Sequence, residues 1–407
     1  MDQITHRERV LRTIEHQEPD RVPILFGNHS VYSINDMPPY GYRALCEYLG
    51  IKNYPTPVVN PVGNTLNIDR RVLDRFHVDF EFISPVAPDV EVLPNNLIRV
   101  LHLNGTLFKQ VGNLYTLAGD TFCPLHDAKT IEDIENYPYW TDYNNPLYYE
   151  GKAKEAKKLH EESDYAIISD DTPVSFGEMY QYLLGFDRKL IDIRRRPEFF
   201  HAVMEKIWQG CQTFLENWLT EVGDYIDLQL IYDDQGMQDR TIFSLEDFRK
   251  FIKPYWERYI KLVRKYTKAK LVIHSCGSNY TIFPEIIEVG FDAYHTLQPF
   301  AWNMEPWRLK KEFGNKICFI GGFDHQKILP RSTPSEVKEF VKGLIYDYAP
   351  GGGYIFAPTH DIGGEVPPEN IVAGFDAAFE YGRYPIEIKN RPDFYERAFT
   401  SSRRGFP

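Results

Sequence analysis

Short apolar runs recur along the chain, and most of them are separated by longer segments with helical periodicity. The continuous apolar character of these runs predicts strands that are buried on both faces, which is typical of a parallel sheet. Strands that alternate with helices favour a closed (β/α)8 TIM barrel, and a doubly wound open sheet is the alternative. The eight runs lie at residues 21–27, 78–84, 164–169, 225–232, 270–275, 291–296, 317–322 and 353–358. The amphipathic segments include residues 188–220, 245–267 and 333–347.

Two segments depart from this alternation. Residues 88–125 show little helical periodicity, and Asn104-Gly105 is a hairpin signal. We expect an antiparallel β insertion there, which covers one end of the barrel. The tail at residues 386–407 is polar and partly basic, and the sequence leaves open whether it is loose or packs on a partner chain. With these two additions, we predict one barrel domain over residues 1–407.

Charge and composition narrow the classes of partner. The chain has 46 basic and 58 acidic residues and a net charge of −12, whereas nucleic-acid binding needs clustered Lys and Arg. No apolar run approaches the roughly 20 residues that cross a bilayer, and the charged N-terminus has no apolar signal core. We therefore expect a cytoplasmic protein that binds neither nucleic acid nor membrane. The five cysteines are scattered and odd in number, which argues against a disulfide framework. The oligomeric state stays open.

Polar residues gather where the predicted strands end. In barrels of this kind, function sits at the carboxyl ends of the strands. Asn28 and His29 follow the first run, Asp233 and Asp234 follow the fourth, and His360 follows the last. This concentration of histidine and aspartate at one rim predicts an active site.

His274 and Cys276, in "KLVIHSC", are the most informative pair. They lie two positions apart in a predicted strand, so their side chains leave the same face. A thiolate beside an imidazole selects zinc over magnesium or calcium, and a catalytic zinc site needs about three protein ligands. We expect His360 as the third ligand. The alternative is a core histidine next to a cysteine that acts as a small apolar residue.

Longer stretches carry a family resemblance. The opening "THRERVLRTIEHQEPDRVPI" and the later "IYDDQGMQ", "IHSCGSNYTIFPEIIEVGFDAYHTLQP", "LKKEFGNKICFIGGFDHQKILPRSTPSEV" and "GGGYIFAPTHDIGGEVPPENIVAGFDAA" resemble the uroporphyrinogen decarboxylase-like superfamily. The resemblance covers most of the chain and is weakest from about residue 85 to residue 160. It implies a (β/α)8 barrel.

This superfamily has two branches, and the motifs separate them. The true uroporphyrinogen decarboxylases use no metal and carry an arginine-rich stretch near the N-terminus for the carboxylates of the substrate. Here the corresponding "NHSVYSINDM" contains no arginine. The cobalamin (corrinoid)-dependent methyltransferases hold zinc on a His-x-Cys pair and a distant third ligand, and His274 and Cys276 match the pair. Thiol-methylating members use a cysteine as third ligand, whereas "APTHDIGG" offers His360.

A histidine in place of a cysteine as third ligand changes the chemistry expected of the zinc ion. A set of two histidines and one cysteine carries one thiolate instead of two, so the zinc is more electrophilic. Such an ion suits a neutral ether oxygen better than a bound thiolate. The leading hypothesis is therefore O-demethylation of a methyl ether, such as a methoxylated aromatic, in anaerobic one-carbon metabolism. The Co(I) corrinoid of a separate protein would accept the methyl group, because the chain has no D-x-H-x-x-G corrinoid motif of its own.

The resemblance also implies roles for the other rim residues. Asp233 or Asp234 would be a proton donor, a fourth zinc ligand or a partner that orients a ligand; a helix cap or a salt bridge is the alternative. The expected substrate-binding residues are Asn28, His29, Tyr232, Tyr294 and Gln298.

Three other functions stay open. A related enzyme would transfer the methyl group from a methyl-corrinoid to a thiol or another carrier. A metal-free decarboxylase would use Asp233 or Asp170 to stabilise a protonated intermediate. A non-catalytic binding protein is disfavoured by the density of His, Asp and Cys at one rim. Finally, we interpret Gly321-Gly322 and the glycines at 351–353 as tight turns that let a large ligand approach the backbone.

Overall fold

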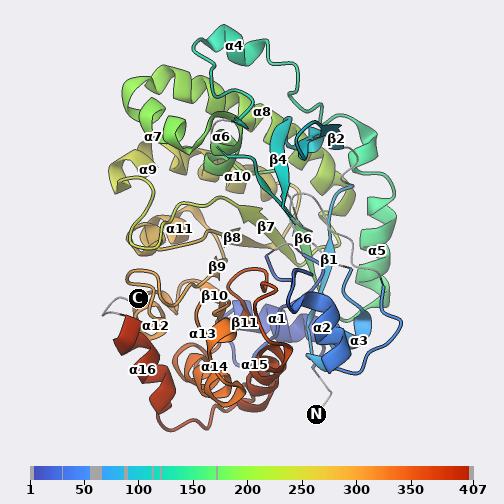
Figure 1. Ribbon diagram of the computed structural model, residues 1–407, viewed down its shortest axis with the longest axis vertical. Coiled ribbons are helices and arrows are strands. Elements are labelled where there is room, and N and C mark those ends of the chain that lie inside the picture. The colour runs from blue at the N-terminus through green and yellow to red at the C-terminus, as the bar shows by residue number, and fades with distance from the viewer. Residues whose placement is uncertain are drawn as a thin grey trace.

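The predicted barrel is present in the computed structural model, which describes residues 4–29, 31–55, 67–86, 90–111, 114–119, 122–170 and 173–402. The main sheet has seven parallel strands in the order β1-β6-β7-β8-β9-β10-β11 (Figure 1). These strands are β1 (Phe80–Ile83), β6 (Ala166–Asp170), β7 (Leu228–Tyr232), β8 (Lys270–His274), β9 (Ala293–Thr296), β10 (Cys318–Phe323) and β11 (Tyr354–Pro358). Each coincides with one of the apolar runs, and β6 and β10 extend one residue beyond theirs.

The first apolar run closes the sheet into a barrel, although it forms only an isolated bridge. Ile24 pairs in parallel with Phe356 of β11, and the Asp79 amide before β1 donates to the Ile24 carbonyl at 2.9 Å. The ladder stays short because Pro23 has no N–H and the Ile24 amide donates to the Asp79 side chain instead. The closed barrel is thus confirmed over the open sheet.

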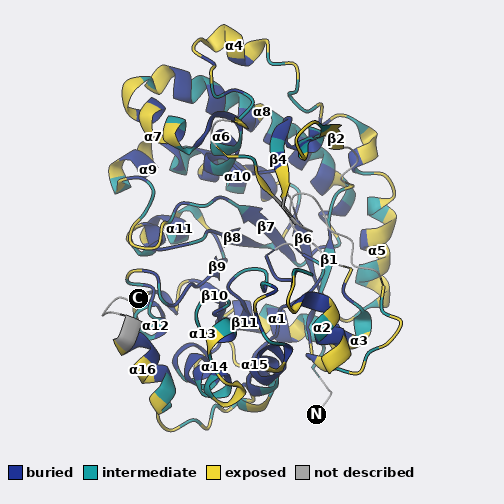
Figure 2. Cartoon of the chain, in the orientation of Figure 1, coloured by how far each residue is buried: buried dark blue, intermediate teal, exposed yellow. Residues whose placement is uncertain are grey.

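Helices surround the strands and bury their outer faces. Figure 2 shows the strands of the main sheet buried and the outer faces of the helices exposed. This is the arrangement expected of a parallel sheet covered on its outside by amphipathic helices. The helices are α1 (His6–Ile14), α2 (Gly41–Tyr48), α3 (Arg70–Arg75), α4 (Ile131–Glu135), α5 (Lys152–Glu162), α6 (Gly177–Leu184), α7 (Phe186–Arg195), α8 (Pro197–Val222), α9 (Leu245–Phe251), α10 (Lys253–Val263), α11 (Phe283–Val289), α12 (Pro306–Phe313), α13 (Ile328–Arg331), α14 (Pro334–Tyr348), α15 (Pro368–Tyr381) and α16 (Asp393–Ser402).

The insertion is a separate four-stranded antiparallel sheet, as predicted. Its strands are β2 (Val90–Leu93), β3 (Leu97–Val100), β4 (Thr106–Val111) and β5 (Leu114–Leu117). The hairpin signal is confirmed, because Asn104 and Gly105 both adopt the left-handed conformation between β3 and β4, with φ of 53° and 70°. Phe108 of β4 packs edge-on against Tyr182, with ring centroids 6.5 Å apart. The insertion therefore rests on α6.

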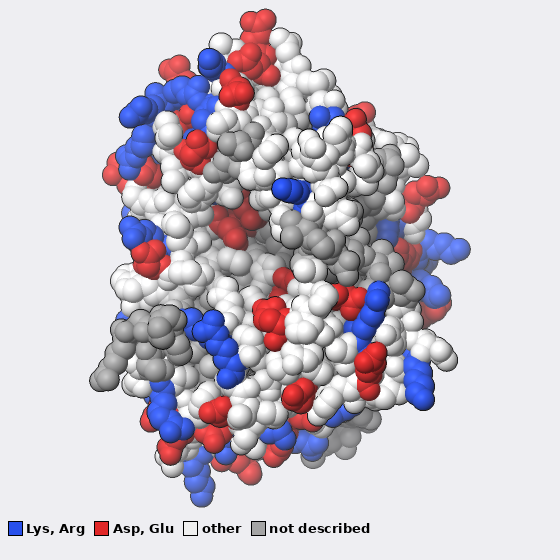
Figure 3. Space-filling model, viewed as in Figure 1, with Lys and Arg blue, Asp and Glu red and all other residues white. Residues whose placement is uncertain are grey.

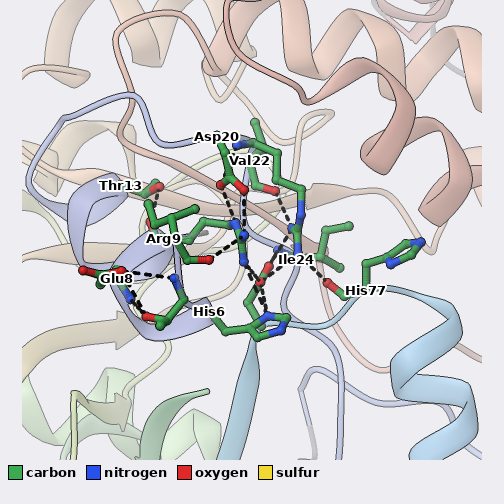
Figure 4. Close-up of polar contacts among 12 residues, drawn as sticks. His6, Glu8, Arg9, Thr13, Asp20, Val22, Ile24 and His77 are labelled. Carbon is green, nitrogen blue, oxygen red and sulfur yellow. Dashed lines mark hydrogen bonds and ion pairs between the residues drawn. The ribbon is translucent and has the colours of Figure 1, made fainter. Parts of the chain in front are cut away.

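A buried ion network ties the N-terminal helix to the barrel (Figure 4). Asp79 is fully buried and accepts hydrogen bonds from Arg9 at 2.8 Å and from Arg21 at 2.8 Å. His6 Nδ1 lies 2.7 Å from the same carboxylate, which also accepts the Ile24 amide at 2.8 Å. One carboxylate thus holds α1, the closing segment and β1 together.

Two glycines of the clusters lie where segments of backbone pack together. A Cβ on Gly321 would lie 2.0 Å from the Thr296 carbonyl oxygen of β9, so this glycine lets two strands approach. A Cβ on Gly352 would lie 2.6 Å from the Gln17 carbonyl oxygen, in the segment that follows α1. These two glycines are needed because backbone packs closely against backbone.

The tail packs on its own chain, which was neither of the two expected arrangements. Tyr395 of α16 is fully buried, and its hydroxyl donates to Asp347 of α14 at 2.7 Å. Gly343 of α14 makes room for this ring, because a Cβ there would lie 2.2 Å from it. Among the described residues, none of the helices combines the length and apolar composition that a bilayer crossing requires.

Candidate metal centre at the barrel mouth

Three strands in register place aromatic and imidazole rings side by side at the carboxyl end of the barrel. Tyr232 of β7 pairs with His274 of β8, and His274 pairs with His295 of β9. Registered neighbours in a parallel sheet point to the same face. Their rings accordingly lie close, at 5.3 Å for Tyr232 and His274 and at 4.8 Å for the two histidines.

His274, Cys276 and His360 form the cluster that the sequence predicted. Each offers one ligand atom, and these atoms lie within 4.8 Å of one another. His274 and Cys276 come from the end of β8, and His360 comes from the loop after β11. The separation of the three atoms suits coordination of a single ion, because Zn–N and Zn–S bonds are about 2.0–2.3 Å long.

The tautomer of His274 is determined by two buried contacts. His295 Nε2 lies 3.0 Å from the Pro358 carbonyl oxygen, which can only accept, so this nitrogen carries the proton. His295 Nδ1 is then an acceptor, and it lies 2.7 Å from His274 Nδ1. His274 therefore donates from Nδ1 and keeps its lone pair on Nε2. Cys276 Sγ lies 3.5 Å from that nitrogen.

We call the hydrogen-bonded series of His274, His295 and the Pro358 carbonyl the histidine relay. Burial keeps both of its histidines neutral. It lowers the pKa of His295 to about 3. It also lowers the pKa of His274 well below the ordinary value, and the neighbouring His295 and His360 lower it further. A neutral imidazole is the form that binds a metal ion. The two rings are thus held in the state that coordination needs.

His360 has a different environment from His274. Burial opposes its charge, but the hydrogen bond and the charge of Asp361 outweigh burial and raise its pKa. The Asp361 carboxylate contacts His360 Nδ1 and accepts from Asn35 at 3.3 Å. A carboxylate on Nδ1 leaves Nε2 as the atom that can face an ion.

The loop that carries Cys276 is held from both sides. The Cys276 amide donates to Asp234 Oδ1 at 2.6 Å, and the Gly277 amide donates to Gln298 Oε1 at 2.5 Å. Gly277 has φ of 79°, and a Cβ there would lie 2.6 Å from the Gly236 backbone. Cys276 carries a free thiol. Burial raises its pKa well above the ordinary value, and the nearby Asp234 raises it further.

The two aspartates after β7 have different burial and different hydrogen-bond partners. Asp233 is fully buried and caps α6, because its Oδ1 accepts the Glu178 amide at 3.2 Å and its Oδ2 accepts the Trp256 indole at 2.8 Å. Asp234 is half-buried, and its Oδ1 lies 3.9 Å from His274 Nε2. Of the two, Asp234 is the one beside the cluster.

The expected substrate-binding residues fall into two groups. His29 stacks on Tyr232 with centroids 5.6 Å apart, and His29 Nε2 lies 3.1 Å from Asp170 Oδ2; both rings are at the mouth. Tyr294 is fully buried against Phe283 of α11, and its hydroxyl donates to a backbone carbonyl.

The remaining two members of the predicted set also hold backbone. Gln298 holds the Gly277 amide, and Asn28 accepts the Ile68 amide at 2.5 Å. These contacts position loops around the carboxyl end of the barrel.

Three residues near the strand ends were not among the predicted site residues. His295 is adjacent to Tyr294 in sequence, and only the strand register decides which of the two points inward. Glu178 lies in the first turn of α6, where acidic residues are common for reasons of helix stability. Tyr182 lies one turn further on. Figure 3 shows this face of the molecule hollowed near its centre, with acidic side chains in the hollow.

Comparison with known proteins agrees with the fold and the motifs. The family model described as Uroporphyrinogen decarboxylase (URO-D) matches residues 178–381, half of the chain, and the chain belongs to this family. The Chlorobium phaeobacteroides uroporphyrinogen decarboxylase is 24% identical over 44% of this chain and 48% of that protein. The chain thus spans about half the length of this relative. The Alkalilimnicola ehrlichii uroporphyrinogen decarboxylase is 21% identical over 93% of this chain and 94% of that protein.

A solved structure shares the whole architecture. A methyltransferase from Methanosarcina mazei superposes with a TM-score of 0.61 at 14% identity, covering 93% of this chain and 99% of that chain. At this identity the likeness establishes the common fold. The fold and the superfamily predicted from the sequence are therefore confirmed.

Proposed function

We propose that this chain is a zinc-dependent methyltransferase that moves a methyl group from a small methylated substrate to the Co(I) corrinoid of a partner protein. The best candidate substrate is a methyl ether, such as a methoxylated aromatic. The observation that carries the proposal is the convergence of His274, Cys276 and His360 within 4.8 Å at the rim where barrel enzymes place their active sites. The fold shared with a Methanosarcina mazei methyltransferase agrees with this class of reaction.

The residues of the cluster fit a zinc ion. One thiolate and two imidazoles form a ligand set that zinc prefers. The hydrogen bond to His295 leaves His274 Nε2 unprotonated, and the Asp361 carboxylate contacts Nδ1 of His360. Bound there, zinc would supply a Lewis acid for a substrate oxygen and would stabilise the Cys276 thiolate.

The surroundings of the cluster favour an aromatic methyl ether. Tyr232, Phe82 and Tyr182 are half-buried rings at the mouth. His29 stacks between the first two, with centroids 5.4 Å from Phe82 and 5.6 Å from Tyr232. Such a wall offers ring faces and edges to a flat apolar ligand. We propose His29 and Tyr232 as substrate contacts and Asp234 as the carboxylate that holds the Cys276 loop.

A decarboxylase of porphyrinogens fits the same mouth less well. Its substrate carries many carboxylates, and here Asp234 and Asp361 lie beside the cluster. Like charges at close range oppose binding. The segment after the first apolar run, "NHSVYSINDM", also contains no arginine to pair with those carboxylates.

Metal content is the first test. Elemental analysis of the wild type is expected to give about one zinc per chain, as three protein ligands and one open position require. Cys276→Ala and His360→Ala should lose the metal, whereas Cys46→Ala, which removes a buried thiol in α2, should keep it. After exchange for cobalt(II), the thiolate charge-transfer band should be present in the wild type and absent in Cys276→Ala. A wild type without metal would contradict the proposal and favour the metal-free decarboxylase.

Methyl transfer is the second test. The zinc form is mixed with a Co(I) corrinoid protein and a series of methyl ethers, and the methyl-corrinoid spectrum is followed. Formation of methyl-corrinoid with the wild type and not with Cys276→Ala is the expected result. Demethylation of a methyl-corrinoid by added thiols, with no reaction of ethers, would establish the opposite direction of transfer.

A further inference from the structure

Four ionisable side chains outside the metal cluster meet where β7 ends beneath α6. Asp233 and Asp234 follow β7, Glu178 lies in the first turn of α6, and Lys189 comes from α7. Lys189 is fully buried, and its Nζ has no hydrogen-bond partner in the described part of the chain. Burial lowers the pKa of this ammonium group, and the charges of Asp233, Glu178 and Asp234 oppose that shift.

The geometry places the ammonium group within the cluster of carboxyl groups. The Cβ position of Gly177 would lie 3.3 Å from Lys189 Nζ and 3.3 Å from Asp233 Oδ1. Three carboxyl groups therefore share one buried cation. Asp234 and Glu178 are half-buried, and all three carboxyl groups act on the same ammonium group, so repulsion between like charges favours a proton on one of them.

The hydrogen-bond partners differ among the three carboxyl groups. Asp233 receives only N–H donors, from the Phe176 and Glu178 amides and from the Trp256 indole. Asp234 receives the Cys276 amide at 2.6 Å. Groups that can only donate require an ionised acceptor or an unprotonated oxygen. Asp233 accepts N–H donors on both oxygens and is therefore held as a carboxylate, whereas Asp234 needs only Oδ1 unprotonated.

Glu178 has partners of another kind. Its carboxyl oxygens lie 3.4 Å from the Ser175 hydroxyl and 3.4 Å from the Tyr182 hydroxyl. A hydroxyl can accept as well as donate, so both contacts tolerate a protonated carboxyl group. The N-terminal amide groups of α6 do not stabilise a charge on Glu178, because the Glu178 amide already donates to Asp233.

Electrostatics point the same way. Burial raises the pKa of Glu178 well above its ordinary value, and the charges of Asp234 and Asp233 raise it further. The Glu178 charge also raises the pKa of the Cys276 thiol and of the Tyr182 phenol. In the structure, the Glu178 amide donates to Asp233, and the adjacent Asp234 lies 3.9 Å from His274 Nε2.

We propose that Glu178, held protonated by Asp233 and Asp234, is the general acid that protonates the oxygen leaving the methyl group. This inference rests on the proposed function. In the step, the methyl–oxygen bond breaks and its electron pair stays on oxygen. The electron pair of Co(I) forms the carbon–cobalt bond, which takes cobalt to Co(III). The Glu178 proton moves to the oxygen, so the products are an alcohol or phenol, a methyl-corrinoid and the Glu178 carboxylate.

Infrared spectroscopy tests the protonation state without any turnover. At neutral pH the wild type should show the C=O stretching band of a protonated carboxyl group, and this band should shift in D₂O. Glu178→Gln should lack the band, and the surface variant Glu162→Gln should keep it. A wild type without the band, or a band that survives in Glu178→Gln, would overturn the proposal. Circular dichroism and zinc content, both expected to match the wild type, show that Glu178→Gln is folded.

The acidity of the leaving group tests the catalytic role. Two aryl methyl ethers are compared, one with a nitro group that makes the phenol acidic and one without. Glu178→Gln should slow transfer from the unactivated ether by ~10²–10⁴-fold, the usual effect of a general acid. It should slow the nitro ether much less, because that phenolate leaves without a proton. Equal losses for both ethers would overturn the role. If the wild type transfers neither methyl group, the proposed function fails, and the infrared band still decides the state of Glu178.

Discussion

The Nδ1 atoms of His274 and His295 lie 2.7 Å apart, and the Pro358 carbonyl behind them determines which one carries the proton. A backbone acceptor thereby sets the tautomer of a predicted metal ligand through a second histidine. This arrangement is the one expected where imidazole must present its Nε2 lone pair to an ion.

Removal of the acceptor behind His274 should weaken metal binding without removing a ligand. His295→Phe keeps a ring but cannot accept the His274 Nδ1–H, so we expect zinc affinity to fall by ~10–100-fold. His295→Asn places an amide oxygen near the former Nδ1 and should retain most of the affinity. Competition with a chelating dye measures both. Equal affinity of His295→Phe and the wild type would show that the relay is unimportant.

Gly277→Ala should disturb the loop that carries Cys276. The left-handed conformation alone is expected to cost about 1–2 kcal/mol for alanine, and the added Cβ would lie 2.6 Å from the Gly236 backbone. Gly290→Ala is the matched control, since Gly290 has φ of 105° and its Cβ would meet only Ile260 at 3.7 Å. Thermal unfolding should show the larger loss for Gly277→Ala, with a lower zinc content. The idea fails if the two variants behave alike.

Asp79→Asn should destabilise the barrel in a pH-dependent manner. Burial would raise the pKa of Asp79, but the His6 hydrogen bond and the charges of Arg21 and Arg9 outweigh it and hold the pKa below its ordinary value. Removing one partner of a buried pair is expected to cost about 3–5 kcal/mol.

The pH range of this effect follows from the depressed pKa. The stabilisation by Asp79 is complete above the unfolded pKa of about 3.9 and is lost as pH falls through the lower, folded value. Urea unfolding of the wild type and Asp79→Asn should therefore differ most near neutral pH and least in strong acid. A difference in the free energy of unfolding that is constant with pH would contradict this account.

The C-terminal helix α16 should contribute to global stability. Tyr395→Ala removes a fully buried ring, which is expected to cost about 3–5 kcal/mol. Tyr395→Phe keeps the ring and removes only the bond to Asp347, which also pairs with Arg391, so a loss of about 1.5–3 kcal/mol is expected. Denaturant unfolding gives both values. A loose tail would leave both variants as stable as the wild type.

The sequence predicted the main elements because they depend on short-range patterns. Each apolar run is a segment that can be buried on both faces, and that property is visible in a few residues. The exception is residues 21–27, where Pro23 and the Asp79 side chain reduce a strand to a bridge. The tail was not predictable, because its position depends on a cavity above Gly343 in a distant helix.

By itself, the sequence determined the alternation of strands and helices, the insertion and the His-x-Cys pair, since the spacing of two residues places both side chains on one face. Only the tertiary structure placed His360 beside that pair. It also determined that His295, and not Tyr294, contacts His274, and that Asp233 caps α6 while Asp234 lies beside the cluster. These outcomes depend on strand register and on loops that meet across 84 residues or more of chain, from Cys276 to His360. Such contacts follow from the packing of the whole barrel, which no local pattern records.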